Sequence, residues 1–173
     1  MVQGGHLGRM IGARANQKKK EMRIEFHKNS GLRELSVLTK RELFVAGIAL
    51  YWGEGNKKSK LGFINSDPEM IKFMFRWFQE CMGVKREDFM PRIFINAIHK
   101  PRIDTVLTFW SDLLKLPQDQ FGNPVFLNRN SKKVYENYHD YFGLLTLQVH
   151  KSTDMKYKIL GLIDGLKIHN RPV

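Results

Sequence analysis

The sequence predicts an α+β fold in which a mainly antiparallel sheet packs against helices. Segments with the alternating pattern of strands are few and short, and turn residues or helical patterns separate them. In the longer segments apolar residues recur at helical spacing, as in Met70, Phe73, Trp77 and Cys81. A doubly wound parallel sheet is the alternative, but no glycine-rich phosphate loop follows any of the expected strands.

The composition is that of a folded and strongly basic protein. The chain has 173 residues, of which 42% are hydrophobic, and this length allows a substantial core. Its formal net charge of +12 indicates nucleic acid as the partner, with an anionic membrane surface as the weaker alternative. The single cysteine, Cys81, excludes an intramolecular disulfide and a cysteine-based zinc site, and favours a cytoplasmic protein. No apolar segment is long enough to span a membrane or to serve as a signal peptide, so we expect no membrane partner.

Residues 1–37 are expected to form a basic arm, separate from a domain of residues 38–173. The arm is rich in glycine at its start and has few apolar residues, although residues 14–28 have a mixed helical pattern. It is either a solvated segment or one that becomes ordered by contacting DNA phosphates. The residues expected to make that contact are Lys18, Lys19 and Lys20.

The domain is expected to begin with a helix whose end is chemically distinctive. Thr39 to Glu42 form a capping box, and residues 43–52 have almost no polar side, which predicts a helix buried all round. Gly47 would let a second helix approach closely. The helix ends in Gly-Glu-Gly at 53–55, which places the Glu54 carboxylate beside the carbonyl oxygens of a helix C-terminus. Such a set of oxygens favours a hard cation such as Mg²⁺.

The remaining elements follow from alternation, caps and prolines. Strands are expected at residues 61–66 and 92–98, a long hairpin at residues 124–130 and 141–150, and helices at residues 68–82, 101–116 and 155–167. Asp67-Pro68 is a strong helix start and Gly83 a stop. In the second hairpin strand, one face carries Leu145, Leu147 and Val149, and the other carries Thr146, Gln148 and His150.

Residues 47–55, read as Gly-Ile-Ala-Leu-Tyr-Trp-Gly-Glu-Gly, resemble the signature of the LAGLIDADG homing-endonuclease family. The match is good at the end, where the small residue, the acid and the glycine are residues 53–55. It departs at Trp52, where the family usually has an acid, and at Ala49, where it has a glycine. The order of expected elements over residues 39–116 follows the family's repeat. The single motif is also similar to that of a divergent bacterial group with no settled function.

The resemblance implies site-specific, Mg²⁺-dependent hydrolysis of double-stranded DNA. Glu54 would be the catalytic metal ligand together with the backbone oxygen of Gly55, and Lys100, expected at a strand end, would stabilise the transition state. One acid per chain is too few, so the resemblance implies a homodimer that brings two Glu54 side chains together. Residues 159–167 superficially resemble a second signature, but Leu166 stands in the place of the acid, and we interpret them as an ordinary helix.

Position and residue type suggest further contacts with DNA. Phosphate contacts are expected from Lys57, Lys58, Lys60, Arg102, Lys132 and Lys133. Base edges are expected to be read by Asn128, Arg129, Asn130, Thr146, Gln148 and His150. Because residues 55–65 are too short for the long DNA-reading hairpin of the family, the hairpin at 124–150 is expected to provide that surface.

Two other functions remain open on the same scaffold. One is a DNA-binding transcriptional regulator that does not cut, and the other is an RNA-binding protein that assists splicing. The presence of Glu54 favours cutting, whereas the loss of the family's usual acidic context favours binding alone.

Overall fold

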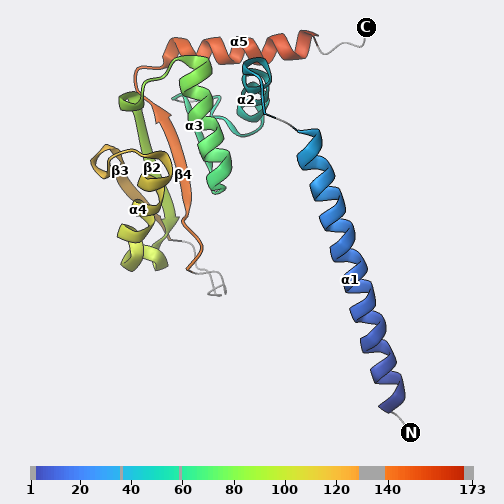
Figure 1. Ribbon diagram of the computed structural model, residues 1–173. Helices are drawn as coiled ribbons and strands as arrows, with labels where there is room; N and C mark the ends of the chain where they lie inside the picture. Colours follow the sequence, from blue (N-terminus) through green and yellow to red (C-terminus); the bar gives the residue numbers. More distant parts are fainter. Residues whose placement is uncertain (1–2, 36, 59, 129–138, 170–173) are drawn as a thin grey trace. The chain divides into compact units, whose positions relative to one another are not determined.

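The computed structural model describes residues 3–35, 37–58, 60–128 and 139–169 (Figure 1). The chain divides into two units, Met1–Thr39 and Lys40–Val173. The first unit contains the helix α1 (Gln3–Glu34), and the second contains the sheet and the other helices.

Helix α1 is longer than the helical segment that the sequence predicts, because the glycine-rich start of the chain is also helical. Hydrogen bonds between side chains one turn apart support it, with Gln17 donating to Glu21 at 2.8 Å and Asn29 donating to Glu25 at 3.0 Å. The described residues of its unit form no other helix or strand, so within that unit α1 is stabilised by local bonds of this kind.

The second unit is built on a four-stranded sheet with the order β1-β4-β2-β3. The strands are β1 (Gly62–Asn65), β2 (Phe89–Asn96), β3 (Gly122–Leu127) and β4 (Leu144–Val149). Strand β4 pairs antiparallel with both β1 and β2, whereas β3 pairs parallel with β2. The fold is therefore α+β, as predicted, with a mixed sheet in which antiparallel pairing predominates.

The hairpin predicted at residues 124–130 and 141–150 is wrong, because β3 and β4 are not neighbours. Strand β4 lies between β1 and β2, and β3 pairs with the other side of β2, where Ile95 is opposite Phe126. The residues of β4 alternate between buried and half-buried, which suits a central strand with one covered face. The residues of β3 do not alternate in this way, as expected of a strand at the edge of the sheet.

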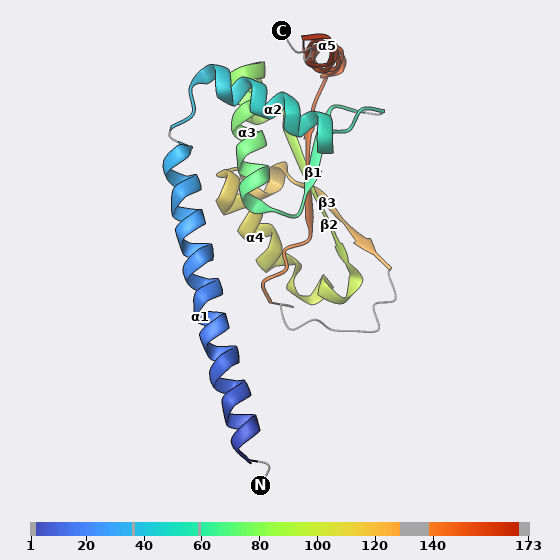
Figure 2. The same cartoon turned by 90° about the vertical axis from the view of Figure 1, so that its right-hand side faces the viewer.

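Four helices of the second unit accompany the sheet: α2 (Lys40–Glu54), α3 (Pro68–Met82), α4 (Ile103–Leu114) and α5 (Thr153–His169). Short 3-10 helices are η1 (Arg86–Asp88), η2 (Ala97–Arg102) and η3 (Gln118–Gln120). Helices α3 and α4 lie on one side of the sheet (Figure 2). Phe75 and Phe78 of α3 pack on Phe89 of β2, with ring centroids 4.5 and 6.1 Å apart, so this side contains the core.

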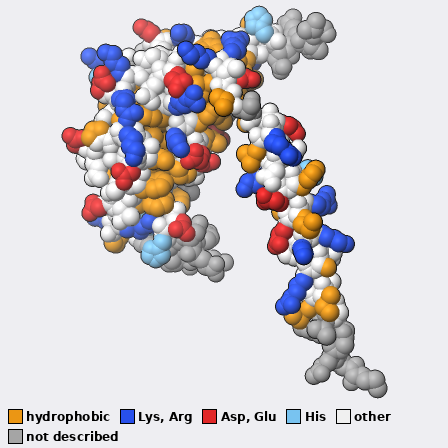
Figure 3. Space-filling view, in the orientation of Figure 1, with side chains coloured by type: hydrophobic (Ala, Val, Ile, Leu, Met, Phe, Trp, Pro, Cys, Tyr) orange, Lys and Arg blue, Asp and Glu red, His pale blue; other side chains and the backbone are white. Residues whose placement is uncertain are grey.

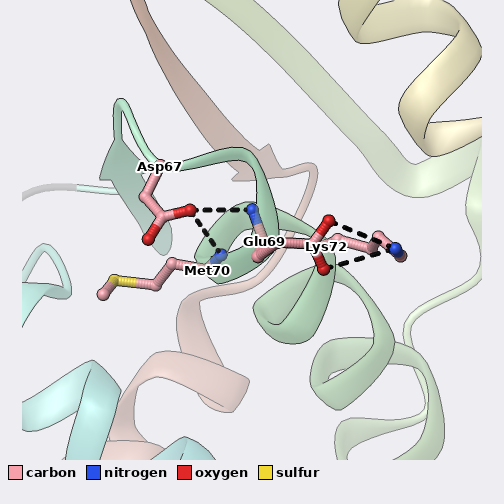
Figure 4. A network of polar contacts seen from close by, with 4 residues as sticks. All are labelled: Asp67, Glu69, Met70 and Lys72. Carbon is pink, nitrogen blue, oxygen red and sulfur yellow. Dashed lines mark hydrogen bonds and ion pairs between the residues drawn. The ribbon is translucent and has the colours of Figure 1, made fainter. Parts of the chain in front are cut away.

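The start and end of α3 confirm the prediction from Asp67-Pro68 and Gly83. The Asp67 carboxylate accepts hydrogen bonds from the backbone N–H of Glu69 at 2.9 Å and of Met70 at 3.4 Å (Figure 4). Gly83 ends the helix with a φ of 74°, a left-handed conformation that glycine adopts without strain.

The segment between β2 and α4 differs from its prediction. Strand β2 starts at Phe89 and contains Pro91, which was expected in a loop; β3 pairs with β2 only from Arg92 onward, so the proline has a strand on one side only. The Asn96 side chain accepts a hydrogen bond from the N–H of Ile98 at 3.0 Å and turns the chain into η2. Helix α4 therefore begins at Ile103 and not at Pro101.

Helix α2 is buried on one side and not all round. Leu43, Gly47, Ile48 and Tyr51 are buried, whereas Trp52 is 41% exposed. The prediction for Gly47 is confirmed by the contact with α3, because a Cβ at residue 47 would lie 2.0 Å from Cδ1 of Trp77. The Trp77 indole also donates to the carbonyl oxygen of Phe44 at 3.1 Å. The Trp77 indole thus holds α2 and α3 in close contact, by packing against Gly47 and by a hydrogen bond to the backbone of α2.

Helix α5 packs against α2 and buries Ile159 and Ile163. Lys167 lies over the ring of Trp52, 5.6 Å from its centroid. In the described part of the chain, no helix combines the length and the apolar content needed to cross a bilayer.

Gly47→Ala is expected to lower the free energy of unfolding by about 2 kcal/mol, because the new methyl group must displace the buried Trp77 indole. Gly53→Ala is the matched control, since nothing lies within 4 Å of a Cβ there. It should raise the free energy of unfolding by about 0.5 kcal/mol through helix propensity. Urea denaturation of both variants measures the difference, and equal effects would contradict the tight α2–α3 contact.

Candidate nucleic-acid interface

The sheet has one covered face and one open face. Leu145, Leu147 and Val149 of β4 are buried toward the helices, as predicted. Residues that alternate with the buried ones lie on the other side of the sheet, which we term the open face. Its residues are Gly62 and Ile64 of β1, Leu144, Thr146 and Gln148 of β4, Met90, Arg92 and Phe94 of β2, and Gly122 of β3.

Arg92 and Gln148 are the polar centre of the open face, and each lies over a glycine of a neighbouring strand. A Cβ on Gly122 would come within 3.1 Å of Nε of Arg92, and one on Gly62 within 3.5 Å of Cγ of Gln148. Glycine at these two positions leaves room for the long polar side chains to lie along the sheet. Glycine within strands often marks a place where a ligand or another backbone approaches closely.

Arg92 was not among the residues expected to contact DNA. It is exposed, and it lies in the same cross-strand row as Ile64 and Thr146. The alternation of residues 89–96, with Phe89, Ile93 and Ile95 buried, is the sequence signal that could have placed Arg92 on the outer side.

The other predicted base-reading residues have different environments. The Thr146 hydroxyl is enclosed by its neighbours and has no hydrogen-bond partner among the described residues, so it is not accessible to a base edge. Asn128 is exposed directly after β3, and His150 is exposed directly after β4, with its N–H donating to the carbonyl oxygen of Asp88 at 2.8 Å. Four residues expected to contact DNA lie outside the described residues: Arg129, Asn130, Lys132 and Lys133.

The lysines between α2 and β1 extend the positive charge at the β1 edge of the sheet. Lys57, Lys58 and Lys60 are all exposed. Figure 2 shows this connection projecting from the sheet on the side away from α3. On the face of the second unit in Figure 3, by contrast, Lys and Arg are interspersed with Asp and Glu and form no patch of one sign.

Glu54 is the last residue of α2, and its side chain is exposed. The turn after it is held by Tyr51, whose hydroxyl donates to the carbonyl oxygen of Asn56 at 2.6 Å, while the N–H of Gly55 donates to the carbonyl oxygen of Tyr51 at 2.8 Å. A Cβ at residue 55 would meet this carbonyl oxygen at 2.5 Å, so the glycine is required for the turn. The sequence Gly-Glu-Gly thus presents one carboxylate at a rigid helix end.

The magnesium site predicted at Glu54 has few side-chain ligands among the described residues. Among the described residues there is no group of three or more His, Cys, Asp or Glu side chains that could hold a metal ion. Mg²⁺ requires several oxygen ligands around an octahedral centre, and the chain contributes one carboxylate and nearby carbonyl oxygens at residues 54–55. The other ligands of the predicted site would be water or groups of a second molecule.

Lys100 and Arg102 differ from their expected positions. Lys100 lies within η2, beyond the end of β2, and its ammonium group is 5.8 Å from the ring centroid of Phe126. The Arg102 guanidinium donates to the carbonyl oxygens of Tyr141 at 3.0 Å and His139 at 2.6 Å. Arg102 therefore fastens η2 to the segment before β4.

Burial, with a smaller contribution from the nearby Arg102 charge, lowers the pKa of His99.

The basic residues of α1 do not all share one face. Successive helical residues point about 100° apart, so Lys18 lies on a different face from Lys20. Lys19 and Lys20 share a shallow groove with Arg23 and His27. Arg23 and His27 thus extend the predicted lysine cluster along the helix.

No protein-family model matches the chain, and comparisons with curated proteins and with solved structures find no match. The resemblance of residues 47–55 to the endonuclease signature accordingly stays a prediction.

The Tyr51 hydroxyl provides a pH-dependent test of the turn that carries Glu54. Burial raises the pKa of Tyr51 from 10.0 to about 12, and a hydrogen bond with the backbone of Gly62 acts in the opposite direction. Because the pKa in the folded state is raised, the stabilisation is complete below pH 10 and is lost as the pH rises toward 12. We expect the alkaline loss of unfolding free energy to be smaller in Tyr51→Phe. An identical pH profile for the two proteins would contradict this assignment.

Proposed function

We propose that this protein binds double-stranded DNA through the open face of its sheet. The observation that supports this most directly is the placement of Arg92 and Gln148 over Gly122 and Gly62. Long side chains that lie along a sheet, over glycines of the neighbouring strands, form a flat surface with hydrogen-bonding groups. The net charge of +12 supplies the long-range attraction to a polyanion.

The chemistry of the two side chains matches the major groove. An arginine can donate two hydrogen bonds to guanine, and a glutamine can pair with adenine through its amide. The exposed Lys57, Lys58 and Lys60 are suited to phosphates beside the groove, where they contribute affinity without sequence preference.

The open face favours duplex DNA over single-stranded RNA. Sheets that bind single-stranded RNA stack its bases on exposed aromatic rings. Phe94 is the aromatic residue among those that define the open face, and it is only partly exposed. The face is suited to hydrogen bonding and not to stacking.

Metal-dependent cleavage of DNA by a homodimer is a second candidate function. The exposed position of Glu54 at the end of α2 favours it, together with the exposed Ala49 and Gly53 on the same helix. Small exposed residues would let a second copy of α2 come close, as in the family that residues 47–55 resemble. Two Glu54 carboxylates with the oxygens of Gly55 would then hold Mg²⁺, which activates water and stabilises charge during phosphodiester hydrolysis.

Each Glu54 would contribute binding of the metal and no proton transfer in this arrangement. Two carboxylates close together repel each other, so the pair is favourable only with a cation between them. Protein without metal should therefore dimerise more weakly than protein with Mg²⁺. The regulator and the nuclease differ in this property as well as in cleavage.

Arg92→Ala is expected to weaken binding of a preferred duplex by about 1–3 kcal/mol, because it removes a contact with a base or a phosphate. The duplex is first selected from a random library, and affinity is measured by fluorescence anisotropy at several salt concentrations. Arg92→Lys distinguishes a base contact from a phosphate contact, because lysine keeps the positive charge but lacks the two paired donors that arginine offers to one base.

Arg76→Ala is the control for Arg92→Ala. Arg76 is an exposed arginine of α3, paired with Glu80 on the covered side of the sheet. It should leave affinity unchanged. Equal losses in the Arg92 and Arg76 variants would place DNA binding elsewhere on the protein.

Glu54→Gln is expected to abolish Mg²⁺-dependent nicking of supercoiled plasmid while leaving DNA affinity within about twofold, because it removes a metal ligand and no positive charge. Glu87→Gln is the control, as Glu87 is an exposed acid of η1. If the wild-type protein binds DNA tightly but does not cut it in the presence of any divalent metal, the result supports the regulator instead.

A further inference from the structure

A cavity of about 240 Å³ lies where β4 ends and α5 begins. Three parts of the chain form its wall: residues 60–61 before β1, Met90 of β2, and residues 149–156, which run from the end of β4 into α5. Its polar lining residues are Lys60, His150, Lys151, Ser152, Thr153 and Lys156. The cavity differs in this respect from the groove between α2 and α3, which is mainly apolar and includes Glu80.

The lining of the cavity has one sign of charge. It includes three lysines and a histidine, and no acidic residue is among the lining residues that the structure describes. Asp154 lies in the first turn of α5 but does not line the cavity. Lys60 comes from one segment and Lys151 and Lys156 from another, and their like charges favour an anion between them.

The wall of the cavity is held in place by the backbone. The Ser152 hydroxyl donates to the carbonyl oxygen of Val149 at 2.7 Å, and the N–H of Val149 donates to the carbonyl oxygen of Leu61 at 3.2 Å. The backbone N–H of His150 donates to the backbone carbonyl oxygen of Asp88 at 2.8 Å. These bonds join the backbones of the two segments that contribute the lysines, so the wall of the cavity is formed before any ligand arrives.

Two features of the N-terminal end of α5 favour an anion in the cavity. The Lys156 ammonium group lies 5.7 Å from the ring centroid of Tyr157, which restrains it. The N–H of Lys156 donates to the carbonyl oxygen of Ser152 at 2.9 Å, and the amides of residues 153–155 precede this bond at the positive end of the helix.

The cavity adjoins the open face of the sheet. Met90 lines the cavity and also lies on the open face, opposite Gln148 in the register of β2 and β4. An anion in the cavity is therefore next to the residues that carry the proposed base contacts.

We propose that this cavity binds one phosphate group, namely a backbone phosphate of the DNA that lies on the open face. The inference rests on the proposed function for the source of the phosphate, whereas the chemistry of the cavity applies equally to a free phosphate. Lys60, Lys151 and Lys156 bind the same phosphate, and this sets the register of the duplex relative to Arg92 and Gln148.

Binding of one phosphate by three lysines has a distinctive salt dependence. The slope of log K against log salt reports the number of phosphates neutralised, at about 0.9 per phosphate for duplex DNA. The triple variant Lys60→Gln, Lys151→Gln and Lys156→Gln should therefore reduce the slope by about 0.9 in total. Three independent contacts would reduce it by about 2.7, and that result, or no change, overturns the proposal.

Lys158→Gln is the matched control for the triple variant, because Lys158 is exposed on α5 and does not line the cavity. It should change neither the affinity nor the slope. Fluorescence anisotropy on the full chain gives both quantities, and the circular dichroism of each variant verifies that it is folded.

Titration with inorganic phosphate separates failure of this proposal from failure of DNA binding. Phosphate is expected to shift the amide resonances of residues 151–153 in the wild-type protein and not in the triple variant. If wild type binds no DNA but shows these shifts, the proposed function fails and the cavity binds free phosphate. If wild type binds DNA and the triple variant has an unchanged slope, the DNA function stands and this inference fails.

Discussion

The pairing of β4 with both β1 and β2 is the interaction on which the rest of the second unit depends. This strand brings together β1, which follows the Gly-Glu-Gly turn, and β2, which leads through η2 into α4. Its inward residues Leu145 and Leu147 are fully buried in the core under the helices. Its outward residue Gln148 and its end at Val149 shape the open face and the basic cavity. Burying one side of β4 therefore orients the residues on its other side.

The basic side chains of the unit divide into those that hold the fold and those that are available to a ligand. Arg86 donates to the carbonyl oxygen of Leu114 at 2.7 Å and lies over the ring of Phe75, and Arg102 binds the carbonyl oxygens of residues 139 and 141. These guanidinium groups replace water at the carbonyl oxygens of a helix end and a loop. Arg92 and Lys60 are exposed instead. Net charge alone overstates the surface that a polyanion can use.

Binding and cleavage place different demands on this scaffold. The open face is complete in one chain, because its strands and its two strand glycines belong to the same unit. In the proposed nuclease, a magnesium site at Glu54 would take ligands from a second copy, since the described residues of one chain contain no group of three metal-binding side chains. In this proposal DNA binding is a property of the folded monomer, and cleavage depends on protein concentration and on the metal. The turn at Tyr51 and Gly55 serves both, since it positions Glu54 and leads into β1.

Local sequence patterns were sufficient for the elements whose cause is local. The Asp67 cap and the Gly83 stop depend on a few adjacent residues, and both are confirmed. The burial of alternate β4 residues and the close helix contact at Gly47 are also confirmed, although the packing partners are distant in sequence. The neighbours of β3 and β4, the one-sided burial of α2 and the structural role of Arg102 depend on segments distant in sequence. Arg92 became a candidate only when β2 was seen to present it beside Gly122. Strand pairing and long-range packing carry no local signal, because the same alternation can be satisfied by more than one neighbour.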